Sequence, residues 1–304
     1  MSTYFIQRSA RALLTLLVVL TFVFFATRLT GDPTDFLLPD DASPQAVAEL
    51  RTTLGLDQPL PTQYVAYLLT VVRGDFGISY FERRAVTTML GERVGPTFQL
   101  ALLSLALAIV LGLPAGIIAA LNRNSVVDRA VMALSFSAYA IPNFVLGIGL
   151  IFLVSLQLQM LPSSGYGSWR HFLMPVFTLG ASSAALLARL ARSSVLDTIH
   201  QDYVRTARSK GLTDSTVVLK HVLRNAFTPI LTILGLQVGT LVAGSIVVET
   251  VFAWPGVGRL IIRAVQQRDF PVLQLAVVVV AASVVLVNFA VDMLYAVVDP
   301  RVRD

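Results

Sequence analysis

A polar stretch at residues 192–225, called the basic loop below, holds the side chains best suited to grip another macromolecule. It contains both lysines of the chain, Lys210 and Lys220, among several arginines. Charged side chains fix the register of a docked surface, and a small residue such as Ala207 beside them lets that surface approach closely. A basic helix lying on anionic lipid would have the same composition, and spacing alone leaves both interpretations open.

We expect the basic loop to form two short helices with a bend between them. Asp202 is placed to cap the first helix, and Gly211 is placed to stop it in a left-handed conformation. Thr213 then caps a second helix, with Asp214 near the positive end of the helix dipole. Three residues of the first helix are expected to share one face: Val204, Ala207 and Arg208.

The sequence lacks the patterns of common enzyme sites. There is no cysteine, no His-Glu-x-x-His zinc motif and no Gly-x-Ser-x-Gly elbow, and the histidines stand in separate segments at His171, His200 and His221. A Walker A loop needs a lysine followed by serine or threonine, but Lys210 precedes Gly211 and Lys220 precedes His221. We therefore predict neither an enzyme nor a metal site. An intramembrane protease is the weak alternative, because no base accompanies the serines.

The composition is that of an integral membrane protein. Of 304 residues, 55% are hydrophobic and 13% are charged, whereas soluble domains carry about 25% charged residues. About 20 apolar residues in a helix cross a bilayer, and such stretches recur along the chain without strand alternation. We expect an all-α protein with about six transmembrane helices at residues 12–29, 97–121, 131–158, 172–191, 226–252 and 272–298.

Small and polar residues inside these spans have distinct expected roles. Glycine pairs four residues apart, such as Gly112 and Gly116, allow close helix contact, and Pro142 is placed to kink its span. Polar side chains at membrane depth usually face a bundle interior or water. We expect six of them to line a path or a subunit interface, with hydrogen bonding between helices as the alternative: Gln237, Ser245, Glu249, Ser283, Asn288 and Asp292.

The distribution of arginine and lysine predicts the sidedness of the chain. Basic residues precede the first span, separate the second from the third, fill the basic loop and end the chain, so this side is expected to be cytoplasmic. Residues 1–11 and 299–304 are then cytoplasmic termini, 12–29 is the first span, and 97–298 is the transmembrane core. Residues 30–96 lie outside as a small helical cap, with one helix between Ser43 and Gly55 and another ending at Gly74. A mere spacer is the alternative.

The basic loop resembles the cytoplasmic "EAA" loop of ABC-importer permeases of the dipeptide/oligopeptide branch. The likeness runs from Asp202-Tyr203-Val204-Arg205 through Lys210-Gly211-Leu212 and continues at His221-Val222-Leu223-Arg224-Asn225-Ala226. Similar signatures stand in order along the chain, among them Arg73-Gly74-Asp75-Phe76-Gly77 and Trp254-Pro255-Gly256-Val257-Gly258. Arg205 and Thr206 stand where the general pattern has an acidic residue and alanine. The resemblance implies ATPase coupling by Asp202, Tyr203, Arg205, Thr206, Ala207, Arg208, Lys210, Gly211, Leu212, His221 and Arg224.

This resemblance implies the fold of a type I ABC-importer permease and a channel-forming subunit that works by alternating access in a bacterial or archaeal inner membrane. The implied partners are a second similar permease, two ATPase subunits that bind ATP and Mg, an extracytoplasmic solute-binding protein and membrane lipid, but no nucleic acid. Short peptides are the expected substrate. Nickel complexes, glutathione and oligosaccharides are alternative substrates. A non-transporting scaffold and a passive channel are alternative functions of other classes.

Overall fold

The computed structural model describes residues 2–29, 32, 34–39 and 41–298, and regular structure within them is helical apart from one isolated bridge between Ile78 and Ala85. Five helices are long and apolar enough to cross a membrane. They are α1 (Ser2–Leu29), α5 (Val86–Leu121), α8 (Trp169–Ile199), α11 (Arg224–Val251) and α13 (Phe270–Val298). The predicted all-α membrane fold is confirmed.

The expected third span is a broken helix pair instead of one rod. α6 (Val126–Ala140) is followed by α7 (Asn143–Leu150) and the π-helix η1 (Ile151–Gln157), and the two halves are bent by 98°. Pro142 has no N–H to donate, and its ring drives Ile141 out of the helical region, to ψ 120°. The pair counts as a sixth span only if both halves are taken as one membrane segment.

Helices α5 and α8 pack with their backbones almost in contact. A Cβ atom added at Gly112 would lie 2.5 Å from the carbonyl oxygen of Ala184, and one at Gly116 would overlap the carbonyl of Ala188. Gly180 on α8 meets Ser104 of α5 in the same manner. These glycines let two long helices approach closely without side chains between them, as the glycine spacing in α5 predicted.

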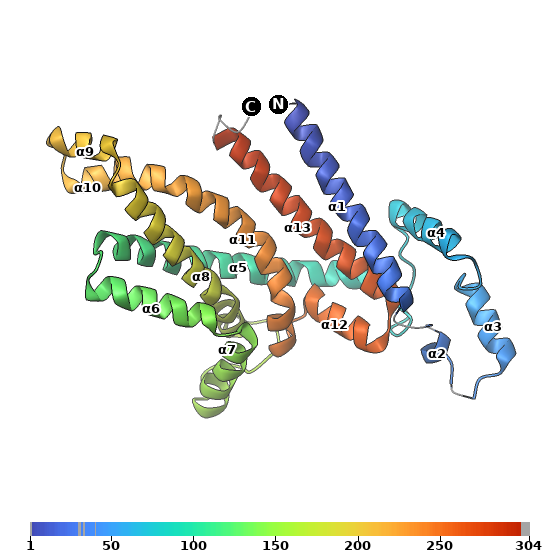
Figure 1. Ribbon diagram of the computed structural model, residues 1–304. Coiled ribbons are helices and arrows are strands. Elements are labelled where there is room, and N and C mark those ends of the chain that lie inside the picture. The colour runs from blue at the N-terminus through green and yellow to red at the C-terminus, as the bar shows by residue number, and fades with distance from the viewer. Residues whose placement is uncertain (1, 30–31, 33, 40, 299–304) are drawn as a thin grey trace.

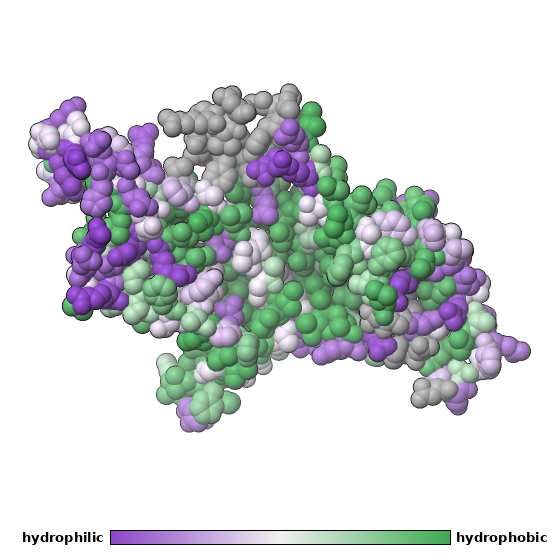
Figure 2. Space-filling model, in the orientation of Figure 1, coloured by the Kyte–Doolittle hydropathy of each residue, from purple (hydrophilic) through white to green (hydrophobic). Residues whose placement is uncertain are grey.

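Polar surface lies at the ends of the bundle, and apolar surface lies between them. Figure 2 shows hydrophobic residues across the middle of the molecule and hydrophilic residues at both extremities. In Figure 1 the short helices α9 (Asp202–Ser209) and α10 (Asp214–Thr216) stand at one extremity, while α2 (Thr34–Leu37), α3 (Pro44–Thr53) and α4 (Leu60–Arg73) stand at the other. An apolar band between polar ends suits a bilayer.

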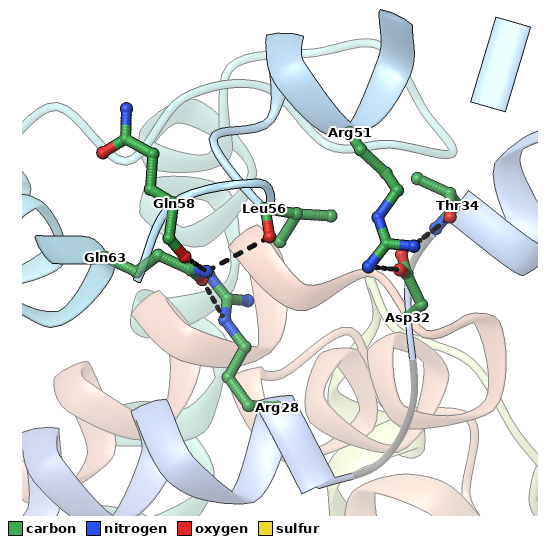
Figure 3. Close-up of polar contacts among 7 residues, drawn as sticks. All are labelled: Arg28, Asp32, Thr34, Arg51, Leu56, Gln58 and Gln63. Carbon is green, nitrogen blue, oxygen red and sulfur yellow. Dashed lines mark hydrogen bonds and ion pairs between the residues drawn. The ribbon is translucent and has the colours of Figure 1, made fainter. Parts of the chain in front are cut away.

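The cap, defined here as α2 to α4, has the helix boundaries that the sequence indicated. Ser43 accepts a hydrogen bond from the N–H of Ala46 at the start of α3, and Gly55 and Gly74 adopt the left-handed φ values of +66° and +70° after α3 and α4. In Figure 3, Arg28 at the end of α1 donates to Gln63 of α4 (2.9 Å), and Asp32 pairs with Arg51 of α3 (3.2 Å). These contacts attach the cap to the first span.

Asp269 attaches the segment after the cap to the start of α13. It is 2% exposed and lies between α12 (Val257–Gln267) and α13. Its carboxylate accepts from Ser79 Oγ (2.5 Å) and from the backbone N–H of Tyr80 (3.1 Å). Because a buried carboxylate needs such donors, this bond fixes residues 79–81 against the start of α13.

We predict that Gly116→Ala destabilises the protein by about 1–3 kcal/mol, since the new methyl group meets backbone that cannot move aside. Gly95→Ala in the same helix is the matched control, because a Cβ at Gly95 has nothing within 4 Å. The measurement is the thermal unfolding midpoint in detergent. Equal midpoints for the two variants would contradict the close packing of α5 on α8.

Candidate functional site

The basic loop is mostly helical, and its second part continues directly into a span. Residues 192–199 are the last turns of α8, and after α10 the chain runs through the π-helix η2 (Val217–Leu223) straight into α11. The separate second short helix expected from the sequence is therefore wrong: it is the beginning of α11. No proline or glycine stands between Thr213 and Ala226 to interrupt the helix.

Helix α9 begins one residue earlier than predicted. Gln201, with extended backbone angles, is the N-cap, and its carbonyl oxygen accepts from the N–H of Val204. Asp202 is the first helical residue and makes a 3.6 Å ion pair with Arg205 instead of a cap bond. Its carboxylate still lies in the first turn, where the helix dipole favours negative charge.

The bend after α9 has the predicted conformation. Gly211 has a φ of +77°, and its N–H donates to the carbonyl oxygen of Arg208. Thr213 precedes α10, but its hydroxyl contacts Thr216 Oγ1 (2.9 Å) rather than a backbone N–H. Arg208 reaches across the bend to Asp214 at 3.5 Å. The bend thus depends mainly on glycine, because an exposed ion pair contributes little.

One face of α9 is buried against its own chain. Val204 is 0% and Ala207 5% exposed, and both join an apolar cluster, called the loop core below, with Ala120, Val195, Val217, Val222 and Ala226. Ala207 is therefore not a site of close approach for a partner, and Arg208 is exposed instead of sharing this face. The loop core ties α9 to the ends of α5, α8 and α11, so these four elements are expected to move together.

Most of the predicted coupling residues lie on the open face. Asp202, Tyr203, Arg205, Thr206, Arg208, Lys210, Gly211, Leu212 and Arg224 are exposed, and His221 is half-buried. Beside them is a groove of about 550 Å³ with apolar walls from Leu121, Ile199 and Leu219 and a charged rim of Arg208 and Asp214. The sequence analysis did not predict this groove. Leu219, an apolar residue beside Lys220 in a polar stretch, could have indicated an apolar surface there.

Glu249 lies in the interior, where it caps another helix. The side chain is 0% exposed, and its carboxylate accepts from Thr97 Oγ1 (2.7 Å), Ser245 Oγ (3.0 Å) and the backbone N–H of Arg259 (3.1 Å). That N–H belongs to the first turn of α12, where unpaired donors favour an anion. The arrangement favours a structural role for Glu249 and Ser245 over the wall of a path.

Glycines and an aromatic side chain complete this capping site. A Cβ at Gly256 would collide with the carboxylate of Glu249, and one at Gly258 would lie 2.9 Å from Glu249 Oε2. Trp254, fully buried, donates from its indole nitrogen to the carbonyl oxygen of Pro96 (3.0 Å). Thr97, which sequence reasoning did not select, bridges the two sides by also accepting from the N–H of Val257.

The other polar candidates divide between α11 and α13. Gln237 is 7% exposed, and Ser283 donates to the carbonyl oxygen of Val279 in its own helix. Asn288 is half-buried beside Gly239, which brings α13 close to α11. The side chain of Asp292 lies outside the described residues. Among the side chains that the structure describes, these positions do not form a continuous polar row.

An ion pair that the sequence did not indicate joins α6 to α8 near the basic loop. Arg192 donates to both carboxylate oxygens of Asp128, at 2.6 and 2.8 Å, and the N–H of Asn124 donates to the same carboxylate at 2.9 Å. Asp128 is 3% exposed. Two-point contact with a planar guanidinium fixes distance and orientation together, so the end of α6 is held against α8.

Comparison with known proteins matches two families over almost the entire chain. Residues 112–304 match the binding-protein-dependent transport system inner membrane component, and residues 1–101 match the N-terminal part of such membrane components. The glutathione transport system permease proteins GsiC of Escherichia coli (strain K12) and Pectobacterium atrosepticum are each 44% identical over 304 residues. The alignments cover 100% of this chain and 99% of each relative.

Solved structures share the fold. The MetNI methionine ABC transporter in an inward-facing conformation aligns with a TM-score of 0.59 and 21% identity over 70% of this chain and 97% of that chain. An amino acid ABC transporter crystallised with histidines aligns with a TM-score of 0.56 and 19% identity over 71% of this chain and 94% of that chain. The likeness confirms the predicted permease fold.

We predict that Glu249→Gln destabilises the protein by about 1–3 kcal/mol, because an amide presents one oxygen acceptor where a carboxylate presents two and leaves a buried donor unpaired. The thermal unfolding midpoint of the purified chain measures the effect. Glu49→Gln, at an exposed position of α3, serves as control. A midpoint for Glu249→Gln no lower than that of this control would contradict the capping role.

Proposed function

The chain belongs to the family of binding-protein-dependent transport system inner membrane components and is a permease subunit of an ABC importer, and we propose that it carries glutathione or closely similar small peptides. The observation that supports this substrate is the 44% identity to glutathione permeases across the full length. Glutathione is one of the alternatives to short peptides that the sequence left open, and the relatives favour this alternative.

An importer permease of this family works with an ATPase and a solute-binding protein. We infer that two ATPase subunits bind at the basic loop, that a second permease completes the pathway, and that the binding protein docks at the opposite extremity. The sidedness follows from the positive-inside rule, which assigns the basic loop to the cytoplasm and the cap to the outside. Both ends of the chain are cytoplasmic in this arrangement.

The geometry of the basic loop supports its role as the ATPase contact. Its exposed face offers Tyr203, 42% exposed, and Leu212, 41% exposed, between charged residues, next to the groove that Leu219 lines. Aromatic and arginine side chains with apolar neighbours are typical of interface anchors. A basic helix on lipid would also use these charges, but the groove gives a protein surface something to fill.

The loop core explains how ATPase movement would reach the membrane. Val204 and Ala207 are enclosed by residues of α8, η2 and α11, so a displacement of α9 carries the ends of these helices with it. ATP and substrate shift the inward-open and outward-open populations only through contacts that differ between the two states. Contacts between the ATPase subunits and α9, which the loop core joins rigidly to the bundle, can differ between the two states. This coupling needs no ATP site in this chain.

We predict that Gly211→Val lowers ATP-driven uptake several-fold at equal membrane abundance, because a β-branched residue at a φ of +77° is strongly disfavoured. Gly211→Asn is the matched control, since asparagine tolerates left-handed conformations, and a Cβ there has nothing within 4 Å. Uptake by vesicles containing the complete transporter measures the effect. Normal uptake by the valine variant would refute the bend as a coupling element.

We predict ATP-dependent accumulation of labelled glutathione in vesicles that contain the complete transporter with its binding protein, with little competition from an excess of unrelated dipeptide. Accumulation of the dipeptide without glutathione would reject the proposed substrate and restore the broader peptide interpretation. Uptake of glutathione that needs no ATP would instead indicate a passive channel. Vesicles lacking the ATPase subunits are the control.

A further inference from the structure

A cavity of about 300 Å³ lies where α1, the cap and the start of α13 meet. Arg28, Tyr67, Tyr80 and Gln274 line it together with the apolar side chains of Phe24 and Phe270. None of the described residues that line it is acidic. The elements that line the cavity meet at the end of the bundle opposite the basic loop (Figure 1). The cavity shares no lining residue with the loop core or with the Glu249 site.

Tyr67 is one of the residues that line this cavity. The residue is 9% exposed, and its hydroxyl oxygen is buried without a hydrogen-bond partner. A buried polar group left unpaired costs about 1–3 kcal/mol, so its retention needs a reason. Burial, reinforced by Tyr64, raises the pKa of Tyr67 to about 12, so this hydroxyl stays protonated at neutral pH and can donate a hydrogen bond.

Arg28 brings positive charge to the same cavity. Its Nε donates to Gln63 Oε1 (2.9 Å), and the amide nitrogen of Gln63 is turned toward the carbonyl oxygens of Gln58 and Leu56 (Figure 3). Within the described part of the chain, Arg28 makes no ion pair, because the nearby carboxylate of Asp32 is bound by Arg51 and Thr34. The guanidinium is positioned by an amide, lies over the ring of Phe24 and interacts electrostatically with the carboxylate of Asp32 without direct contact.

An oxyanion matches what this cavity offers. A guanidinium with one edge held by Gln63 leaves further N–H donors, and these favour phosphate and carboxylate oxygens. The phenol of Tyr67 supplies a further donor, and so does Tyr80, whose pKa burial also raises. We propose that this cavity binds a phosphate-type oxyanion, with Arg28 as its charge partner and Tyr67 as a hydrogen-bond donor.

Two sources can present this chemistry at the end of α1. Leu29, the residue after Arg28, is 87% exposed, and Phe25, three residues before it, is 46% exposed. Lipid tails could pack on these apolar side chains while the headgroup phosphate binds Arg28. A free small anion would use the same donors without the tails. The sidedness inferred above places the cavity near the outer headgroups, where either source has access.

The first experiment measures retention of phospholipid by the full chain in its detergent-purified complex after incubation with phosphatidylglycerol, with a phosphate-free galactolipid of equal chain length as reference. We expect saturable retention of the phosphatidylglycerol alone. Tyr67→Phe, which removes only the hydroxyl group, should weaken retention about tenfold, and Arg28→Gln should weaken it further. Two nearby changes outside the cavity are matched controls that should retain lipid normally: Tyr64→Phe, whose hydroxyl contacts Thr21, and Arg73→Gln, at an exposed position of α4.

The second experiment adds inorganic phosphate to the delipidated complex and follows thermal unfolding. Saturable stabilisation that Tyr67→Phe weakens and Arg28→Gln abolishes, without lipid retention, would support the oxyanion site and identify a free anion as its source. Equal lipid retention and equal response to phosphate in the wild-type protein, Tyr67→Phe and Arg28→Gln would overturn the proposal. Because Tyr67→Phe keeps the buried ring, its result stands even if Arg28→Gln fails to fold.

Discussion

The backbone contact between α5 and α8 is the constraint on which the other placements depend. Gly112, Gly116 and Gly180 allow the two helices to touch along much of their length, because membrane helices associate through packing rather than through a hydrophobic drive between them. Once α5 and α8 are joined, the end of α8 that carries the basic loop and the end of α5 that carries Thr97 have fixed positions. A side chain at these glycines would push α5 and α8 apart and displace both the basic loop and the site around Thr97.

Buried carboxylates secure the joints between helices that are remote in sequence. Glu249 links the end of α11 to α5 and caps α12, Asp269 fixes residues 79–81 at the start of α13, and Asp128 holds α6 to α8 through Arg192. Each carboxylate has its oxygens occupied by donors, as burial of a charge requires. These bonds connect the apolar helices at specific positions.

The two extremities of the molecule are attached to the bundle in different ways. At one end the loop core makes α9 a continuation of the bundle, so that a partner acting on its exposed face acts on α5, α8 and α11 together. At the other end the cap is attached mainly by polar contacts from Arg28 and Asp32 (Figure 3), and a cavity remains beneath it. In the proposed function, the ATPase would act at the first of these ends and cargo would arrive at the other.

The sequence by itself determined the membrane class, the long spans, the cap helices and the left-handed bend at Gly211, because apolar length, capping residues and glycine act over a few neighbouring residues. It also indicated the permease family through ordered motifs. The sequence also predicted a kink at Pro142, but only the tertiary structure decided that the bend reaches 98°, that Ala207 faces its own chain, and that Glu249 caps α12. Glu249 also binds Thr97, 152 residues earlier in the chain. A helical pattern states which residues share a face but not which helix covers that face.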